Sequence, residues 1–105
     1  MRITELREII KKRIALDPND STVEAYWKEE AAILSENVEE TIKFFSDECS
    51  TEEFSCLCEV FDDVIEKTQS RELIALWEEK LESVNDEKDK QLIKVDIEFA
   101  KERLK

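Results

Sequence analysis

The chain contains no glycine and only one proline, Pro18, in 105 residues. Average usage would place about seven glycines in a chain of this length. Glycine supplies the left-handed backbone positions of tight turns and β-hairpins. Its absence therefore argues against a sheet-rich fold, and it excludes the glycine-rich loops that bind phosphates and dinucleotides.

The apolar residues recur at intervals of three and four, which predicts helices along almost the whole chain. The segment Asp17-Pro18-Asn19-Asp20 ends the first helix, because proline disfavours helical backbone in the residue before it. Short connections make consecutive helices antiparallel neighbours. Residues 1–105 are thus predicted to form one all-helical domain, either a stacked array of helical hairpins like HEAT or TPR repeats or a compact bundle. Six short helices are expected, at about residues 4–16, 21–34, 37–45, 50–65, 70–81 and 86–104.

Several of these helices begin with residues that can cap them. A serine, threonine or asparagine at the start of a helix accepts a hydrogen bond from a free backbone N–H. In a capping box, a glutamate three residues later accepts a bond in return from the backbone N–H of this first residue. Ser70 is expected to open the fifth helix. Capping boxes are predicted at Ser21-x-x-Glu24 and, most clearly, at Ser50-x-x-Glu53, and Asn37-x-x-Glu40 resembles a cap.

The adjacent aromatic pairs Tyr26-Trp27 and Phe44-Phe45 pose a packing question. Neighbouring side chains on a helix point in different directions, so one member of each pair is expected at the edge of the core. Tyr26 is the predicted edge residue and interface anchor, because its hydroxyl tolerates water.

The last helix has apolar residues around more than one face. Leu92, Val95, Phe99 and Ala100 lie on one side, and Ile93 and Ile97 widen this stripe. An exposed stripe at the two isoleucines would favour self-association.

The acidic residues are concentrated in the middle of the chain. The net charge is −12 overall, and residues 1–16, 17–70 and 71–105 carry +3, −13 and −2. A folded acidic surface attracts cationic partners and speeds their capture. The basic side chains of the first helix are expected to compensate charge within the protein.

An acidic stripe is predicted along the fourth helix, opposite its apolar face. Spacings of three and four residues align Glu52, Ser55, Glu59, Asp62 and Glu66, with Asp63 beside them. This stripe is either a solvated surface or a partner-binding surface, and the acidic residues of the two preceding helices favour binding. The predicted partner-binding residues are Tyr26, Glu29, Glu30, Glu59, Asp62, Asp63 and Glu66.

Composition argues against several other functions. Phosphate binding needs clustered Lys and Arg, so neither nucleic acid nor an anionic membrane surface is the expected partner. There is no histidine for a catalytic base or a di-iron site and no glycine for an EF-hand loop, so no enzyme, metal or cofactor is expected. No secretory signal is expected either, and Cys49, Cys56 and Cys58 fit free thiols, which predicts a cytoplasmic protein.

Two stretches of sequence resemble small acidic helical immunity proteins from bacterial contact-dependent inhibition and related polymorphic toxin systems. They are STEEFSCLCEVFDDVIEKTQSRELIALWEEKL at residues 50–81 and YWKEEAAILSENVEETIKFF at residues 26–45. The resemblance implies a cytoplasmic inhibitor that binds one toxin domain and blocks its active site or substrate surface. A nucleic-acid-cleaving toxin has a basic surface, which an acidic inhibitor would complement.

The first hypothesis is therefore a monomeric or weakly dimeric immunity protein that neutralises a basic toxin. The alternative is a non-catalytic helical adaptor or structural protein that can self-associate and whose acidity maintains solubility.

Overall fold

The computed structural model describes residues 1–17 and 19–105, and every regular element within them is helical. Pro18, the predicted helix breaker, lies outside the described residues. Two short elements, a π-helix (η1) and a 3₁₀ helix (η2), continue the α-helices next to them. The elements are α1 (Ile3–Ala15), α2 (Val23–Glu36), α3 (Val38–Lys43), η1 (Phe44–Glu48), α4 (Thr51–Leu57), η2 (Cys58–Val60), α5 (Phe61–Thr68), α6 (Arg71–Leu81) and α7 (Glu87–Glu102).

The predicted all-α fold is confirmed, with one change in the fourth helix. Six continuous helical segments result when η1 is joined to α3 and η2 joins α4 to α5. The single helix predicted over residues 50–65 is interrupted at η2, where 3₁₀ geometry tightens the backbone. Because of this interruption, Glu52 and Glu66 are not on one regular α-helix. Their spacing in sequence is therefore not enough to place them on one straight acidic stripe.

The predicted caps are confirmed at three helix starts and wrong at one. Ser50 and Glu53 form a complete capping box, and Asn37 and Ser70 accept bonds from Glu40 N and Leu73 N at 3.1 and 3.2 Å. By contrast, α2 begins at Val23 rather than at a Ser21 cap. The carboxylate of Asp20 there accepts from both the backbone N and the hydroxyl of Thr22, at 2.9 and 2.7 Å, and this competes with the serine cap.

Among the residues that the structure describes, the backbone takes a left-handed conformation at Gln69. This residue ends α5 with φ 53° and ψ 31°, a conformation that costs a residue with a Cβ roughly 1 kcal/mol. Its side-chain amide donates to Ile65 O at 3.0 Å and to Arg103 O at 2.9 Å. These bonds tie the end of α5 to the end of α7 and offset the backbone cost.

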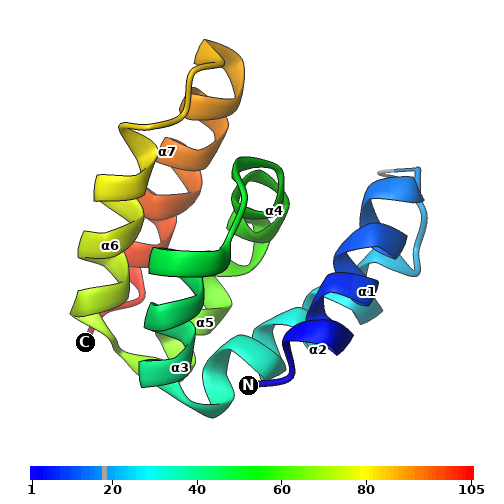
Figure 1. Ribbon diagram of the computed structural model, residues 1–105, viewed down its shortest axis with the longest axis horizontal. Coiled ribbons are helices and arrows are strands. Elements are labelled where there is room, and N and C mark those ends of the chain that lie inside the picture. The colour runs from blue at the N-terminus through cyan, green and yellow to red at the C-terminus, as the bar shows by residue number, and fades with distance from the viewer. Residues whose placement is uncertain (18) are drawn as a thin grey trace.

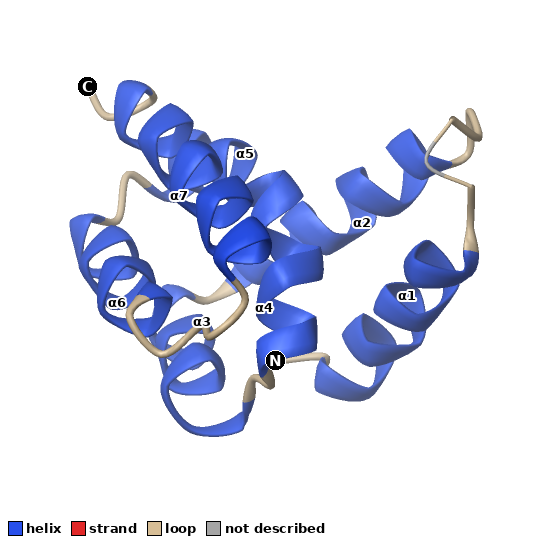
Figure 2. Ribbon diagram, turned by 90° about the horizontal axis from the view of Figure 1, so that it is seen from above, coloured by secondary structure: helices blue, strands red, loops and turns tan. Residues whose placement is uncertain are grey.

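The helices surround a central column made of α4, η2 and α5. In Figure 1, the α1–α2 hairpin lies on one side of this column and the α6–α7 hairpin on the other. Figure 2 shows the same arrangement from above. The radius of gyration is 12.7 Å, close to the roughly 13 Å of a folded domain of this size. Of the two predicted architectures, the structure is consistent with the bundle, because one contiguous core connects both hairpins.

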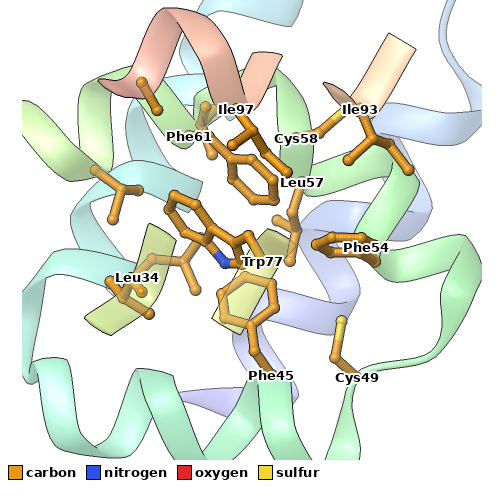
Figure 3. Packing of buried hydrophobic residues seen from close by; sticks show 14 of the residues in the cluster. Leu34, Phe45, Cys49, Phe54, Leu57, Cys58, Phe61, Trp77, Ile93 and Ile97 are labelled. Atoms are coloured by element: carbon orange, nitrogen blue, oxygen red, sulfur yellow. The ribbon is translucent and has the colours of Figure 1, made fainter. Parts of the chain in front are cut away.

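Aromatic rings form the centre of the core (Figure 3). Phe61 stacks on Trp77 with ring centroids 3.8 Å apart and planes 6° from parallel. Phe45 meets both rings edge-on, at 6.0 and 5.7 Å, and Phe54 at 6.2 Å. Three of the six helical segments, α3–η1, α4–η2–α5 and α6, therefore converge on one aromatic cluster.

The expectation that one of Phe44 and Phe45 lies at the core edge is wrong. Both rings are buried, because η1 has neighbours on two sides. Phe45 faces the aromatic cluster, whereas the Phe44 ring lies beneath the Arg7 guanidinium at 5.8 Å. The other pair, Tyr26 and Trp27, is half-buried at the edge of the core.

The apolar faces of α7 are assigned differently from the prediction. Ile93, Ile97 and Ala100 are buried, whereas Leu92, Val95 and Phe99 are about half or more exposed, at 61, 48 and 54%. Both sets have helical spacing, so the sequence pattern alone could not separate them. Packing against α5 and α6 selects the isoleucine face.

Candidate functional site

A cleft of about 490 Å³ opens between the α1–α2 hairpin and the central column. Most of its lining residues come from α1 and α4, the helices labelled so in Figure 1. The end of α1 contributes Arg13 and Ile14, and Asp89 comes from the first turn of α7. The central column supplies the rest of the wall, including Glu52, Ser55, Cys56 and Glu59.

A second hollow of about 370 Å³ adjoins this cleft, and the two share Ile14 and Glu52. It is lined by Ile10 and Lys11 of α1 and by Glu48 at the end of η1, among others. The two hollows together form a groove that runs between α1 and α4.

Glu59 is the most heavily bonded carboxylate of the cleft. The Arg13 guanidinium donates to both of its oxygens, with Nε to Oε2 at 3.0 Å, and the indole Nε1 of Trp27 donates to Oε2 at 2.8 Å. Arg2 and Arg7 form similar pairs with Glu36 and Glu53. The expected charge compensation by the first helix is therefore confirmed, and it connects α1 to the acidic middle of the chain.

Glu30 lies directly behind this pair. It is fully buried, and both carboxyl oxygens lack a hydrogen-bond partner among the described residues. Burial, and to a smaller extent the nearby Glu59, raise its pKa to about 8, although Arg13 opposes the rise. The carboxyl is thus mostly neutral at pH 7.

The burial of Glu30 corrects its prediction as a partner-binding residue of the acidic surface. Glu30 follows Trp27 by three residues, so both project from the same side of α2. The indole of Trp27 reaches out to Glu59, whereas Glu30 is covered by the neighbouring helices. That position removes Glu30 from the exposed acidic surface, although it remains close to the cleft.

The cysteines have thiols rather than thiolates at neutral pH. Burial raises the pKa of both Cys49 and Cys56 to about 12, and Glu30 and Glu59 add to the effect at Cys56. All three cysteines are free. No group of three or more His, Cys, Asp or Glu side chains placed to hold a metal occurs among the described residues.

The other predicted partner-binding residues fall into separate places. Glu29 and Asp63 are exposed, and Tyr26 packs partly against the core. Asp62 and Glu66 share the guanidinium of Arg103, at 3.7 and 3.2 Å. Only Glu59 lines the cleft itself.

Sequence reasoning missed Arg13, Trp27 and Asp89 as parts of the site. Trp27 and Glu30 are three residues apart on α2, so the sequence could have placed both on one side of this helix. Asp89 is 30 residues away from Glu59 in sequence, and only the packing of α7 on the central column brings them to one cleft.

Searches against protein-family models, curated proteins and solved structures found no significant match to this chain. The resemblance to immunity proteins therefore stays a prediction. In the part of the chain that the structure describes, no helix has both the length and the apolar character needed to cross a bilayer.

Proposed function

We propose that this protein is a non-catalytic immunity protein that binds a basic toxin domain through the acidic surface around the cleft. One observation carries the proposal. Three carboxylates, Glu52, Glu59 and Asp89, line the cleft with a single cation, Arg13, and that cation is already bonded to Glu59. The cleft thus retains an excess of negative charge after internal pairing.

The wider charge distribution supports a basic partner. Arg2, Arg7, Arg13 and Arg103 are held in ion pairs within the chain. Exposed acidic residues nearby, such as Asp63, make no ion pair among the described residues. Such a surface raises the association rate with a cationic protein and disfavours anionic partners.

The chemistry of the cleft supports binding rather than catalysis. A thiol with a pKa of about 12, as at Cys56, is a poor nucleophile at neutral pH. Glu30 has the perturbed pKa of a catalytic acid, but its side chain is fully buried and cannot reach a substrate in this conformation. The oxygens of Glu59 are held by Arg13 and Trp27.

The test is co-purification of the tagged protein with the product of the gene immediately upstream, at about physiological salt. A stoichiometric complex with a partner that is toxic when expressed alone is the expected result. Reversing the charge of Asp62 and Asp63 together should slow association and weaken the complex. If no complex forms, or the partner is harmless to cells, the immunity proposal is wrong.

Self-association is the second candidate function, and the exposed face of α7 favours it. Leu92, Val95 and Phe99 lie on adjacent turns and present large apolar side chains to solvent. Sedimentation at micromolar concentration tests it, with Phe99→Glu as the disrupting variant. A stable dimer that this variant dissociates would support an adaptor, whereas a monomer at these concentrations would exclude it.

A further inference from the structure

The groove has apolar side chains at its edges as well as acidic ones inside it. Ile14 is 49% exposed and lines both hollows. On α7, Leu92 lies one turn beyond the lining residue Asp89, so the two side chains are neighbours on the helix surface, although Leu92 itself does not line the cleft. The groove therefore has an exposed apolar side chain in its lining, Ile14, and a second one, Leu92, beside its acidic lining.

The acidic lining also has an unused hydrogen-bonding group behind it. The charged groups that act on the Glu30 carboxyl are Glu59 and Arg13, and Glu30 in turn acts on the thiol of Cys56. All three of these neighbours line the cleft. The unpartnered carboxyl thus lies against the inner face of the cleft wall, within the electrostatic reach of a cation that enters it.

We infer that this groove is the docking site for an amphipathic basic helix of the partner protein, with Arg or Lys side chains toward Glu52, Glu59 and Asp89 and apolar side chains against Ile14 and Leu92. The inference rests on the proposed function and names the surface and the kind of segment that it takes. It is a helix-in-groove mode of recognition, in which spaced side chains from one face act as anchors. A small polycation would match the acidic lining but would leave the exposed side chains of Ile14 and Leu92 uncovered.

The dimensions of the groove agree with this occupant. The α1 residues that line the two hollows run from Arg7 to Ile14, which is about 10 Å, or two turns, at the rise of an α-helix. A bound helix of about three to four turns would therefore cover the whole groove and extend past its ends. The hollows, of about 490 and 370 Å³, can accept several side chains from such a helix but are too small to enclose it, so it would lie along the surface.

Glu30 gives the complex a measurable signature. A cation in the cleft favours the ionised carboxyl, so binding at pH 7 should lower the pKa of Glu30 and release a proton. The titratable and charged groups that face the Glu30 carboxyl are Arg13 on α1, Cys56 on α4 and Glu59 on η2. Calorimetry in two buffers of different ionisation enthalpy should detect the release of more than about half a proton per helix bound, and Glu30→Gln should abolish it.

The direct test uses synthetic peptides of about 15 residues, long enough to form a helix on the surface. One peptide has Leu and Arg on opposite faces of a helix, and its control has the same composition in a shuffled order. The reporter is the indole N–H resonance of Trp27, which donates to Glu59 at 2.8 Å. The only other tryptophan, Trp77, is in the core, and its indole resonance reports whether the fold is unchanged.

A pair of matched variants locates the binding. Glu52→Gln with Asp89→Asn removes two charges from the groove, and Glu39→Gln with Asp47→Asn removes two from exposed positions on α3 and η1 that do not line it. The first pair should weaken peptide binding by roughly tenfold and the second by less than about twofold.

Three results would overturn the inference: no shift of the Trp27 resonance, equal weakening by both pairs of variants, or equal binding of the shuffled peptide. The proposed function is tested separately. If the upstream gene product co-purifies equally well with the groove variant, only the groove assignment fails. If the peptide binds in the groove but no toxic partner is found, only the immunity function fails.

Discussion

The aromatic cluster and the region beneath the cleft are both buried, but their interiors differ in chemistry. The cluster around Phe61 and Trp77 consists of rings in stacked and edge-on contact. The region beneath the cleft holds Glu30, whose carboxyl has no hydrogen-bond partner in the described part of the chain, next to the Arg13–Glu59 pair. One interior is packed from apolar groups, and the other contains charges and a neutralised acid.

This difference separates the source of stability from the candidate binding site. Ring packing adds roughly 0.5–1.5 kcal/mol per pair beyond the burial of apolar area. An unpartnered carboxyl costs stability, because the folded state must keep it protonated as the pH rises. The cluster is not free of such a cost, since the indole N–H of Trp77 also lacks a partner among the described residues. A buried group kept at a cost beside an open cleft is a frequent mark of a functional site.

The largest expected effect is the loss of a ring from the aromatic cluster. Phe61→Ala should reduce the free energy of unfolding by about 3–5 kcal/mol, because it leaves a cavity between rings from several helices. Urea denaturation followed by circular dichroism measures this loss. Phe99→Ala is the control, since that ring is 54% exposed and should cost less than about 1 kcal/mol. Equal losses in the two variants would show that the cluster does not dominate stability.

The second effect concerns Glu30 and appears as a dependence on pH. Its pKa is about 8 in the folded protein, against an ordinary value of 4.5, so the folded state retains a proton that the unfolded state releases. The contribution of this group is fully present below about pH 4.5 and is lost as the pH rises through 8. Relative to Glu30→Gln, the wild-type protein should lose about 3 kcal/mol of stability between pH 5 and pH 8.

Denaturation series at several pH values, run in parallel on both proteins, would measure this difference. Parallel stability curves for wild type and Glu30→Gln would mean that the carboxyl is solvated rather than enclosed behind the cleft.

The smallest of the three effects is the loss of stability when the ion pair of the cleft is broken, compared with the loss for an exposed ion pair. The Arg13 and Glu59 side chains are only 12 and 28% exposed, so Arg13→Met should cost about 2 kcal/mol by leaving Glu59 without its cation. Arg103→Met is the matched control, because Arg103 is 47% exposed and pairs at the surface, where the loss should stay below about 1 kcal/mol. Thermal or urea unfolding at pH 7 compares them. A larger loss for Arg103 would reverse the ranking of the two sites.

Much of the fold could be predicted because its signals are local. Ser50 and Glu53 are three residues apart, and their capping box depends on little else. The failures occur where two local patterns compete. Before α2, Asp20 accepts hydrogen bonds from Thr22 and the predicted Ser21 cap does not form, and α7 carries two apolar faces of similar spacing. Less of the candidate site could be predicted, since Glu59 was named but Arg13 and Asp89 come from other helices.

The sequence by itself determined the helical fold class, because the absence of glycine and the spacing of apolar residues leave few other ways to satisfy the backbone. It also determined an acidic protein with a basic first helix. Only the tertiary structure decided that Glu30 is enclosed, that Ile93 faces inward while Leu92 faces solvent, and that α1, α4 and α7 border one cleft. The physical reason is that burial and electrostatic environment depend on neighbours distant in sequence. Helical periodicity does not indicate which residues these neighbours are.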